Sequence, residues 1–201
     1  MPTAKTIRSM LSAGRHRISS GRTAEVVNLV QANSRKAAQL IECLWDEEPC
    51  VAMRAADALE KLTHRRDLVT DDIQKSILKT LQGSWKAPLI GLLAETTENK
   101  LRWCLVQVVT RLKLTVPEYH RVAETLRSYL EDQSSIVKTC ALQGLADLTW
   151  QDASLLHEVV DLLRIHSRSG TPAMRARGRM LLKQLEPVRA KRCTEYIAGS
   201  V

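Results

Sequence analysis

One twelve-residue pattern of apolar side chains occurs four times along the chain, beginning at residues 51, 101, 137 and 174. In every copy apolar or small residues fill positions 1, 5, 8, 9 and 12, as in VAMRAADALEKL at the first copy and LRWCLVQVVTRL at the second. These positions lie on one face of a helix with 3.6 residues per turn. The repeat therefore predicts four amphipathic helices that bury equivalent faces against their neighbours.

Further helices are predicted before the copies, separated from them by short polar segments. Apolar residues recur at helical spacing in these segments: 34–45, 70–82, 87–94, 115–130 and 151–165. Because the copies begin 36 to 50 residues apart, the chain consists of helix–turn–helix units at the period of helical solenoids. The absence of Phe agrees with this, since a core of Leu, Val, Ile, Ala and Met suits close helix packing.

The expected fold class is therefore all-α, a right-handed α-solenoid of about four to five antiparallel helix pairs. Residues 23–188 are predicted to form the repeat domain. Residues 1–22 are predicted as a basic N-terminal helix or linker, and residues 189–201 as a C-terminal tail. The acid-free, Ser-containing N-terminal segment also has some features of an organellar transit peptide, which is the alternative interpretation of these residues.

The four copies resemble the second helix of HEAT repeats, whose consensus reads Val-Arg-x-x-Ala-Ala-x-Ala-Leu-x-x-Leu. Arg102, Lys138 and Arg175 match the consensus Arg, and Ala52 departs from it. The resemblance covers residues 24–186 and extends to bacterial HEAT-repeat proteins that share an Arg-Trp pair and a Ser-Ser-Ile-Val segment. It implies a helical-repeat architecture, whereas such motifs specify function only weakly.

In HEAT-repeat proteins the second helices line the concave surface, so this resemblance implies that positions 3, 7 and 10 of each copy face a groove. The predicted partner-binding residues in this stripe are Met53, Asp57, Trp103, Gln107 and Gln143. A mixed polar and aromatic stripe suits a protein or peptide better than a phosphate backbone, which requires many cations. We therefore expect a non-catalytic scaffold that binds a protein or peptide partner in its groove.

Basic residues are concentrated at the two ends of the chain. Residues 1–22 contain five basic residues and no acid, and residues 164–201 contain nine basic and two acidic residues. The total of +8 therefore leaves a net charge of −4 between them. The alternative hypothesis is a nucleic-acid interface formed by Arg164, Arg168, Arg175, Arg177 and Arg179. The other interpretation is that these arginines are simply solvated.

Motifs for catalysis, metal binding or cofactor binding were not found, so no catalytic residue, metal ligand or cofactor is predicted. The low-ranking enzymatic alternative is a HEAT-like DNA glycosylase acting on alkylated bases, in which Trp103, Asp147 and Arg111 would take part. Trp45, Trp85 and Trp150 lie near predicted helix ends and are predicted to pack at helix boundaries.

The five cysteines have no CxxC spacing and are odd in number, which indicates a reducing compartment. No apolar run approaches the roughly 20 residues of a membrane span, and the N-terminus lacks the apolar centre of a secretory signal. The predicted location is the cytoplasm, with no membrane association.

Overall fold

The computed structural model describes residues 6–13, 21–64 and 71–198 of the chain, and these residues form helices and no strand. The predicted all-α fold class is therefore confirmed. Three copies of the apolar pattern lie within helices α4 (Pro49–Thr63), α9 (Ser135–Leu148) and α11 (Pro172–Ala198). The second copy lies in α7 (Asn99–Val109) except for its last three residues, which form the turn after this helix. The chain divides into two compact units, Met1–Leu112 and Lys113–Val201.

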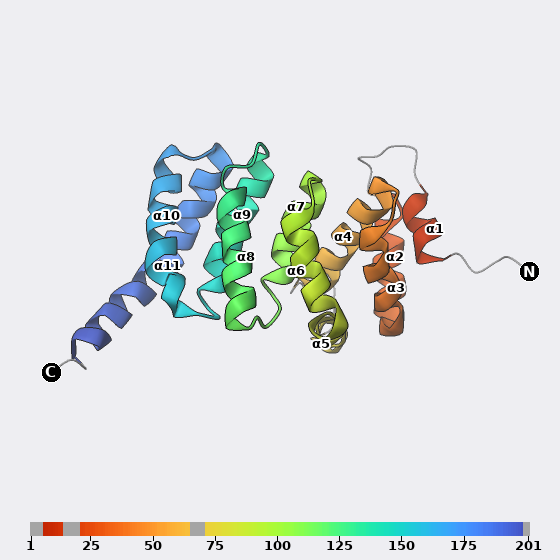
Figure 1. The fold of residues 1–201 in the computed structure, drawn as a ribbon, viewed down its shortest axis with the longest axis horizontal. Helices are drawn as coiled ribbons and strands as arrows, with labels where there is room; N and C mark the ends of the chain where they lie inside the picture. The colour runs from red at the N-terminus through yellow and green to blue at the C-terminus, as the bar shows by residue number, and fades with distance from the viewer. Residues whose placement is uncertain (1–5, 14–20, 65–70, 199–201) are drawn as a thin grey trace, which may run out of the picture. The chain divides into compact units, whose positions relative to one another are not determined.

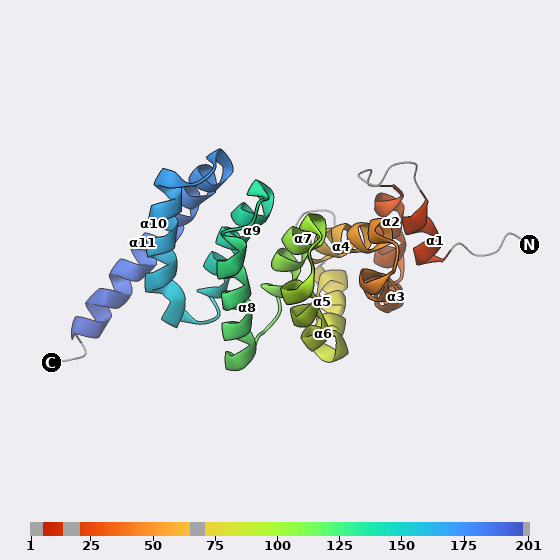
Figure 2. The same ribbon diagram turned by 45° about the horizontal axis from the view of Figure 1, so that its top comes forward.

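The N-terminal unit is assembled around α4 (Figures 1 and 2). The elements that precede α4 are α1 (Ile7–Ser12), α2 (Thr23–Ala32), η1 (Ser34–Lys36), α3 (Ala37–Glu42) and η2 (Cys43–Trp45). The elements that follow it are α5 (Asp71–Thr80), the π-helical turn η3 (Leu81–Trp85), α6 (Lys86–Glu95) and α7. Helices α1, α2, α3, α5 and α7 all contact α4.

Helix α4 is buried on every side from Val51 to Leu59. The alanines at positions 52, 55, 56 and 58 point in different directions around the helix, and their small side chains let neighbouring helices approach from each of them. Pro49 stands in the first turn, where its missing N–H costs no helical hydrogen bond. The small residues of α4 thus make it a central helix rather than one with an open face.

Arg54 is the largest fully buried side chain of the N-terminal unit, with 1% of its surface exposed. Its Nη1 donates hydrogen bonds to the backbone oxygens of Leu11, in the last turn of α1, and of Ala13, the residue after α1. Gly21 adopts φ 51° beside this group, and a Cβ there would lie 2.8 Å from the Ala13 oxygen and 3.0 Å from Arg54 Cζ. Only glycine combines this backbone conformation with so close an approach.

A second set of contacts fixes α1 to the turn before α4. Arg8 donates to both carboxylate oxygens of Asp46, at 2.6 and 3.0 Å, and to Glu48 at 3.1 Å. The Arg8 guanidinium holds the pKa of Asp46 below its ordinary value through these hydrogen bonds. Ile7, Met10 and Leu11 bury the apolar side of α1. The first helix is therefore part of the core of this unit.

The C-terminal unit contains α8 (Val116–Tyr129), α9, η4 (Ala153–Leu155), α10 (Leu156–Ser169) and α11. Helix α8 packs on α9 and α10 packs on α11, and α9 also contacts α11 and α10 (Figure 1). The Thr115 and Glu118 capping box begins α8, and the Ser134 hydroxyl caps α9. Two short-turn helix pairs thus stack within this unit. The predicted continuous solenoid through all pairs stays a prediction.

Side-chain contacts hold the two pairs of the C-terminal unit together. Arg127 of α8 donates to Glu158 of α10 at 2.6 and 2.8 Å, and Tyr119 donates to the backbone oxygen of Asp152 at 3.0 Å. Gly178 lets α11 lie close to α10, because a Cβ there would lie 3.3 Å from the Leu163 oxygen. Helix α11 continues to Ala198, through Pro187 and into the residues predicted as a tail.

Replacing the buried arginine, as Arg54→Ala, is expected to lower the free energy of unfolding of the N-terminal unit by about 3 kcal/mol. The change removes the hydrogen bonds to two backbone oxygens and leaves a cavity beneath α1. Urea unfolding followed by far-UV circular dichroism measures the loss. Arg35→Ala, at an exposed position of η1, is the control and is expected to stay within about 0.5 kcal/mol. Equal stability of the two variants would contradict the assigned role of Arg54.

Candidate binding surface

The first part of the predicted binding stripe is not open. Met53 and Asp57 are each 8% exposed, so the expectation that they face an open groove is wrong. The reason is that α1 and α2 contact α4 in addition to α7, and the pattern of apolar positions did not include them. Asp57 accepts a hydrogen bond from Lys61 at 2.9 Å, one turn further along the same helix.

Trp103 and Gln107 lie on α7 and are both half-buried. Gln107 Nε2 donates to the backbone oxygen of Trp103 at 3.3 Å, so the two residues lie one turn apart on the same side of the helix. They form a small, partly accessible polar and aromatic area in the N-terminal unit. The predicted role of these residues in partner binding stays a prediction.

Gln143 is the centre of a row of polar side chains in the C-terminal unit. Arg177 Nη1 on α11 donates to Gln143 Oε1 at 2.7 Å, and Gln143 Nε2 donates to Asp147 Oδ1 at 2.8 Å. The Gln143 amide thus joins the Arg177 guanidinium on α11 to the Asp147 carboxylate on α9. Its two hydrogen bonds fix the orientation of the Gln143 side chain, which solvent alone would leave free to rotate.

Accessible apolar side chains flank this row. Ile136 is 59% exposed and lies two turns before Gln143 on α9, and Met180 is 43% exposed and lies one turn after Arg177 on α11. We call this surface the α9/α11 face, and it consists of Ile136, Thr139, Gln143, Asp147, Arg177 and Met180. It combines hydrogen-bond donors, acceptors and apolar contacts on two packed helices.

Three of the five predicted nucleic-acid-binding arginines are engaged by the protein itself. Arg164 forms ion pairs with Asp161 at 3.3 Å and Glu186 at 2.9 Å. Arg175 donates to the backbone oxygen of Gly170 at 2.9 Å, which satisfies a carbonyl at the end of α10, and Arg177 donates to Gln143. Arg168 and Arg179 are exposed. Among these five arginines, the ion pairs within the described residues are those of Arg164, so its charge is partly compensated before any phosphate binds.

The residues of the glycosylase alternative also have structural contacts. Arg111 donates to Glu60 Oε1 at 3.0 Å, to the backbone oxygen of Glu60 at 3.1 Å and to Thr63 Oγ1 at 2.8 Å, and so joins α7 to α4. Asp147 accepts from Gln143. Trp103 and Arg111 belong to the N-terminal unit and Asp147 to the C-terminal unit. Within the described residues, no group of three or more His, Cys, Asp or Glu could hold a metal ion.

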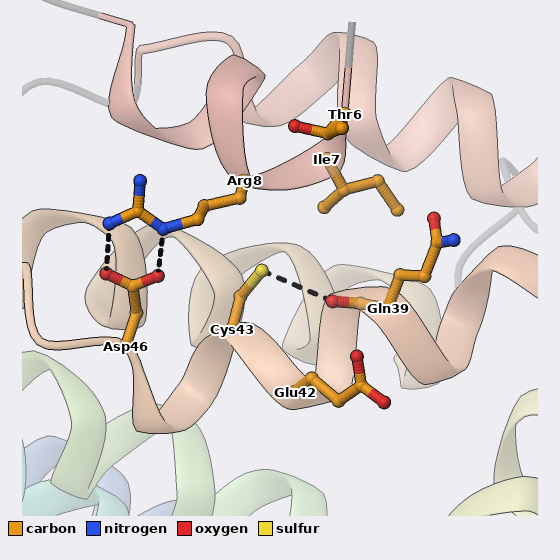
Figure 3. A pocket seen from close by; sticks show the side chains of 7 residues that line it. All are labelled: Thr6, Ile7, Arg8, Gln39, Glu42, Cys43 and Asp46. Carbon is orange, nitrogen blue, oxygen red and sulfur yellow. Dashed lines mark hydrogen bonds and ion pairs between the residues drawn. The ribbon is translucent and has the colours of Figure 1, made fainter.

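A pocket of about 260 Å³ lies between α1 and the α3–η2 segment (Figure 3). Its lining includes Arg8, Asp46, Glu42 and Cys43. The Cys43 thiol donates to the backbone oxygen of Gln39 at 3.2 Å, and burial raises its pKa to about 11. A thiol with a raised pKa is a poor nucleophile at neutral pH, so the geometry favours a structural role for Cys43.

Two tryptophans predicted as packing residues form an accessible aromatic pair. The rings of Trp45 and Trp85 stack with centroids 5.8 Å apart and planes inclined by 29°. Trp45 is 42% exposed, and Trp150 of the C-terminal unit is 64% exposed. The prediction that these tryptophans pack at helix boundaries agrees with the contact between Trp45 and Trp85 and is wrong for Trp150, most of which is exposed.

The comparisons with known proteins support the all-α fold and carry no function. No protein-family model and no curated protein matches the chain. The chain is similar to the crystal structure of an engineered protein from the Northeast Structural Genomics Consortium, with a TM-score of 0.61 and 14% sequence identity over 90% of this chain and 78% of that chain. At this identity the likeness concerns the fold alone. Every helix of the described residues is too short or too polar to span a bilayer.

Alkylation of the native protein by iodoacetamide at pH 7.5 is expected to modify the half-exposed Cys50 well before Cys43. Cys43 is buried, and its pKa of about 11 leaves very little thiolate at that pH. Peptide mass spectrometry at successive times measures both rates, and labelling in urea provides the reference in which the two sites react alike. Equal labelling in the native protein would contradict the assigned environment of Cys43.

Proposed function

We propose that the protein is a non-catalytic helical-repeat scaffold that binds a protein or peptide partner. The proposed docking site is the α9/α11 face, with Gln143 and Arg177 as its polar centre. The observation that carries the proposal is the row of hydrogen bonds from Arg177 through Gln143 to Asp147 on a surface that is otherwise partly apolar. Trp103 and Gln107 are proposed as additional contacts on α7.

The chemistry of the α9/α11 face favours a polypeptide as the ligand. A peptide offers backbone N–H groups, which can donate to Asp147, and backbone C=O groups, which can accept from Arg177. The Gln143 amide can do both. Ile136 and Met180 offer apolar contact, and Met adapts to partners of different shapes. Because Gln143 and Arg177 are already oriented, less conformational entropy is lost when a ligand binds.

The causes of the shifted pKa values also support a binding role over a catalytic one. Burial raises the pKa values of Cys43 and Tyr119, and pairing with arginine lowers those of Asp46 and Glu158. Each of these shifts has a cause in packing or in an ion pair between helices. None of them requires a general acid, a general base or a nucleophile for its explanation.

Nucleic acid is the alternative ligand, and the ion pairs of Arg164 weigh against it. A phosphate backbone binds through cations that release counterions, whereas Arg164 is already neutralised by two carboxylates. We also propose a cytoplasmic location. The five cysteines are odd in number and have no CxxC spacing, which suits a reducing compartment.

Site-specific photocrosslinking in cells that express the protein tests the docking site. Benzoylphenylalanine at position 180 on the α9/α11 face is expected to give discrete protein adducts. The same probe at position 165, where Ile165 is 57% exposed on α10, is expected to give none of them. Adding Gln143→Ala and Arg177→Ala to the position-180 protein is expected to reduce the adducts about tenfold, because two oriented polar groups are lost.

Circular dichroism of each variant provides the folding control for this experiment. Identical adducts at positions 180 and 165, or adducts that persist in the Gln143→Ala, Arg177→Ala protein, would contradict docking on the α9/α11 face. Adducts that contain only nucleic acid would transfer support to the alternative ligand.

A further inference from the structure

The exposed tryptophan pair of the N-terminal unit is a second surface with a definite chemistry. Trp45 ends η2 and Trp85 ends η3, so the stack joins the segment before α4 to the segment between α5 and α6. One face of the Trp45 ring is covered by Trp85. The exposed 42% of Trp45 therefore belongs to its outer face and its edges. A large aromatic surface left accessible on a folded unit is typical of an interaction site.

The backbone departs from regular helix in the turn that ends at Trp85. Residues 81–85 form a π-helical turn in which Gly83 has φ −77° and ψ −117°. An extra residue in a helical turn rotates the following side chains relative to the preceding helix, and such turns occur frequently at functional sites. A Cβ at Gly83 would have no atom within 4 Å, so the space beside this turn is open.

Two exposed glutamates lie close to Trp45 in the sequence. Glu42 lies three residues before Trp45, which places it on the same side of the α3–η2 segment, and Figure 3 shows it directed away from Arg8. Glu47 follows two residues after Trp45, and both glutamates are exposed. Arg8 pairs with Asp46 and Glu48, whereas within the described ranges no ion pair is formed by Glu42 or Glu47.

We propose that the Trp45–Trp85 pair, with Glu42 and Glu47, binds an arginine side chain presented by a protein partner. A guanidinium is planar and weakly hydrated, so it stacks on an indole face while its N–H groups reach carboxylates at the ring edge. Because the two rings stack on each other at an angle of 29°, they offer the open face of an indole and not the enclosing cage that a quaternary ammonium requires. Arginine is therefore favoured over lysine, and an acidic segment is repelled.

This surface is separate from the α9/α11 face and lies entirely in the N-terminal unit. The two faces also differ in chemistry, since the α9/α11 face presents an arginine and the tryptophan platform presents carboxylates. The inference therefore does not depend on the proposed function of the C-terminal unit. A scaffold with both surfaces would contact its partners through complementary charges at each.

An NMR titration of the full chain with an acetylated, amidated tetra-arginine peptide tests the proposal. The indole Nε1–H resonances of Trp45 and Trp85 are assigned from Trp45→Phe and Trp85→Phe. Both resonances are expected to shift and saturate with tetra-arginine, and to shift with tetralysine only at a several-fold higher peptide concentration. Neither is expected to shift with tetracitrulline, whose side-chain ureido groups are planar and uncharged. The variant with Glu42→Gln and Glu47→Gln is expected to raise the Kd for tetra-arginine about threefold to fivefold.

The matched control carries the same charge change at two other exposed glutamates, as Glu95→Gln with Glu124→Gln, and is expected to leave the Kd unchanged. Indole resonances that do not shift would overturn the proposal. Equal affinity for tetra-arginine and tetralysine, or an equal loss of affinity in the control, would reveal only general attraction to acidic groups and would also overturn it. The dispersion of the remaining indole resonances shows that each variant is folded.

Discussion

The N-terminal unit depends on the satisfaction of one buried charge, the guanidinium of Arg54. A charge removed from water is tolerated only when hydrogen bonds replace its hydration, and here the replacements include backbone oxygens at the end of α1. The helix that supplies them must therefore dock on α4, and Gly21 must leave room for the chain to return. From this one requirement follow the burial of Ile7 and Leu11 and the enclosure of α4.

Helix α4 is enclosed and the corresponding stripe of α9 is partly open because the two helices have different neighbours. Helices α1, α2, α3, α5 and α7 all contact α4, and even its Met53 and Asp57 are covered. On α9 the corresponding stripe carries Thr139 and Gln143, which remain accessible beside Arg177. Equivalent positions of one repeated pattern thus serve as core in one unit and as surface in the other. Position within a repeat is not enough to assign a binding residue.

The helices could be predicted from the sequence because the 3.6-residue period is a local property of the chain. The same period identified α4, α7, α9 and α11 and the face that each buries toward its partner. It could not predict the burial of Met53, since the contacts of α4 with α1, α2, α3 and α5 are not encoded in the period of one helix. It could not reveal the stacking of Trp45 on Trp85 either, because that contact joins residues forty positions apart through an irregular turn. The candidate site was thus predicted in residue type and only partly in location.

Formal charge likewise differs from the charge that a partner would meet. The basic residues near both ends suggested an interface for nucleic acid, but Arg8 is used by Asp46 and Glu48, and Arg164 by Asp161 and Glu186. Ion pairs between helices remove these cations from the recognition chemistry, even though exposed pairs of this kind add little to stability. Within the described residues Glu42 and Glu47 are exposed and form no ion pair, in a chain whose net charge is +8. The sign of the total charge therefore does not determine the sign of the surface that a ligand recognises, because recognition depends on the charges that folding leaves unpaired.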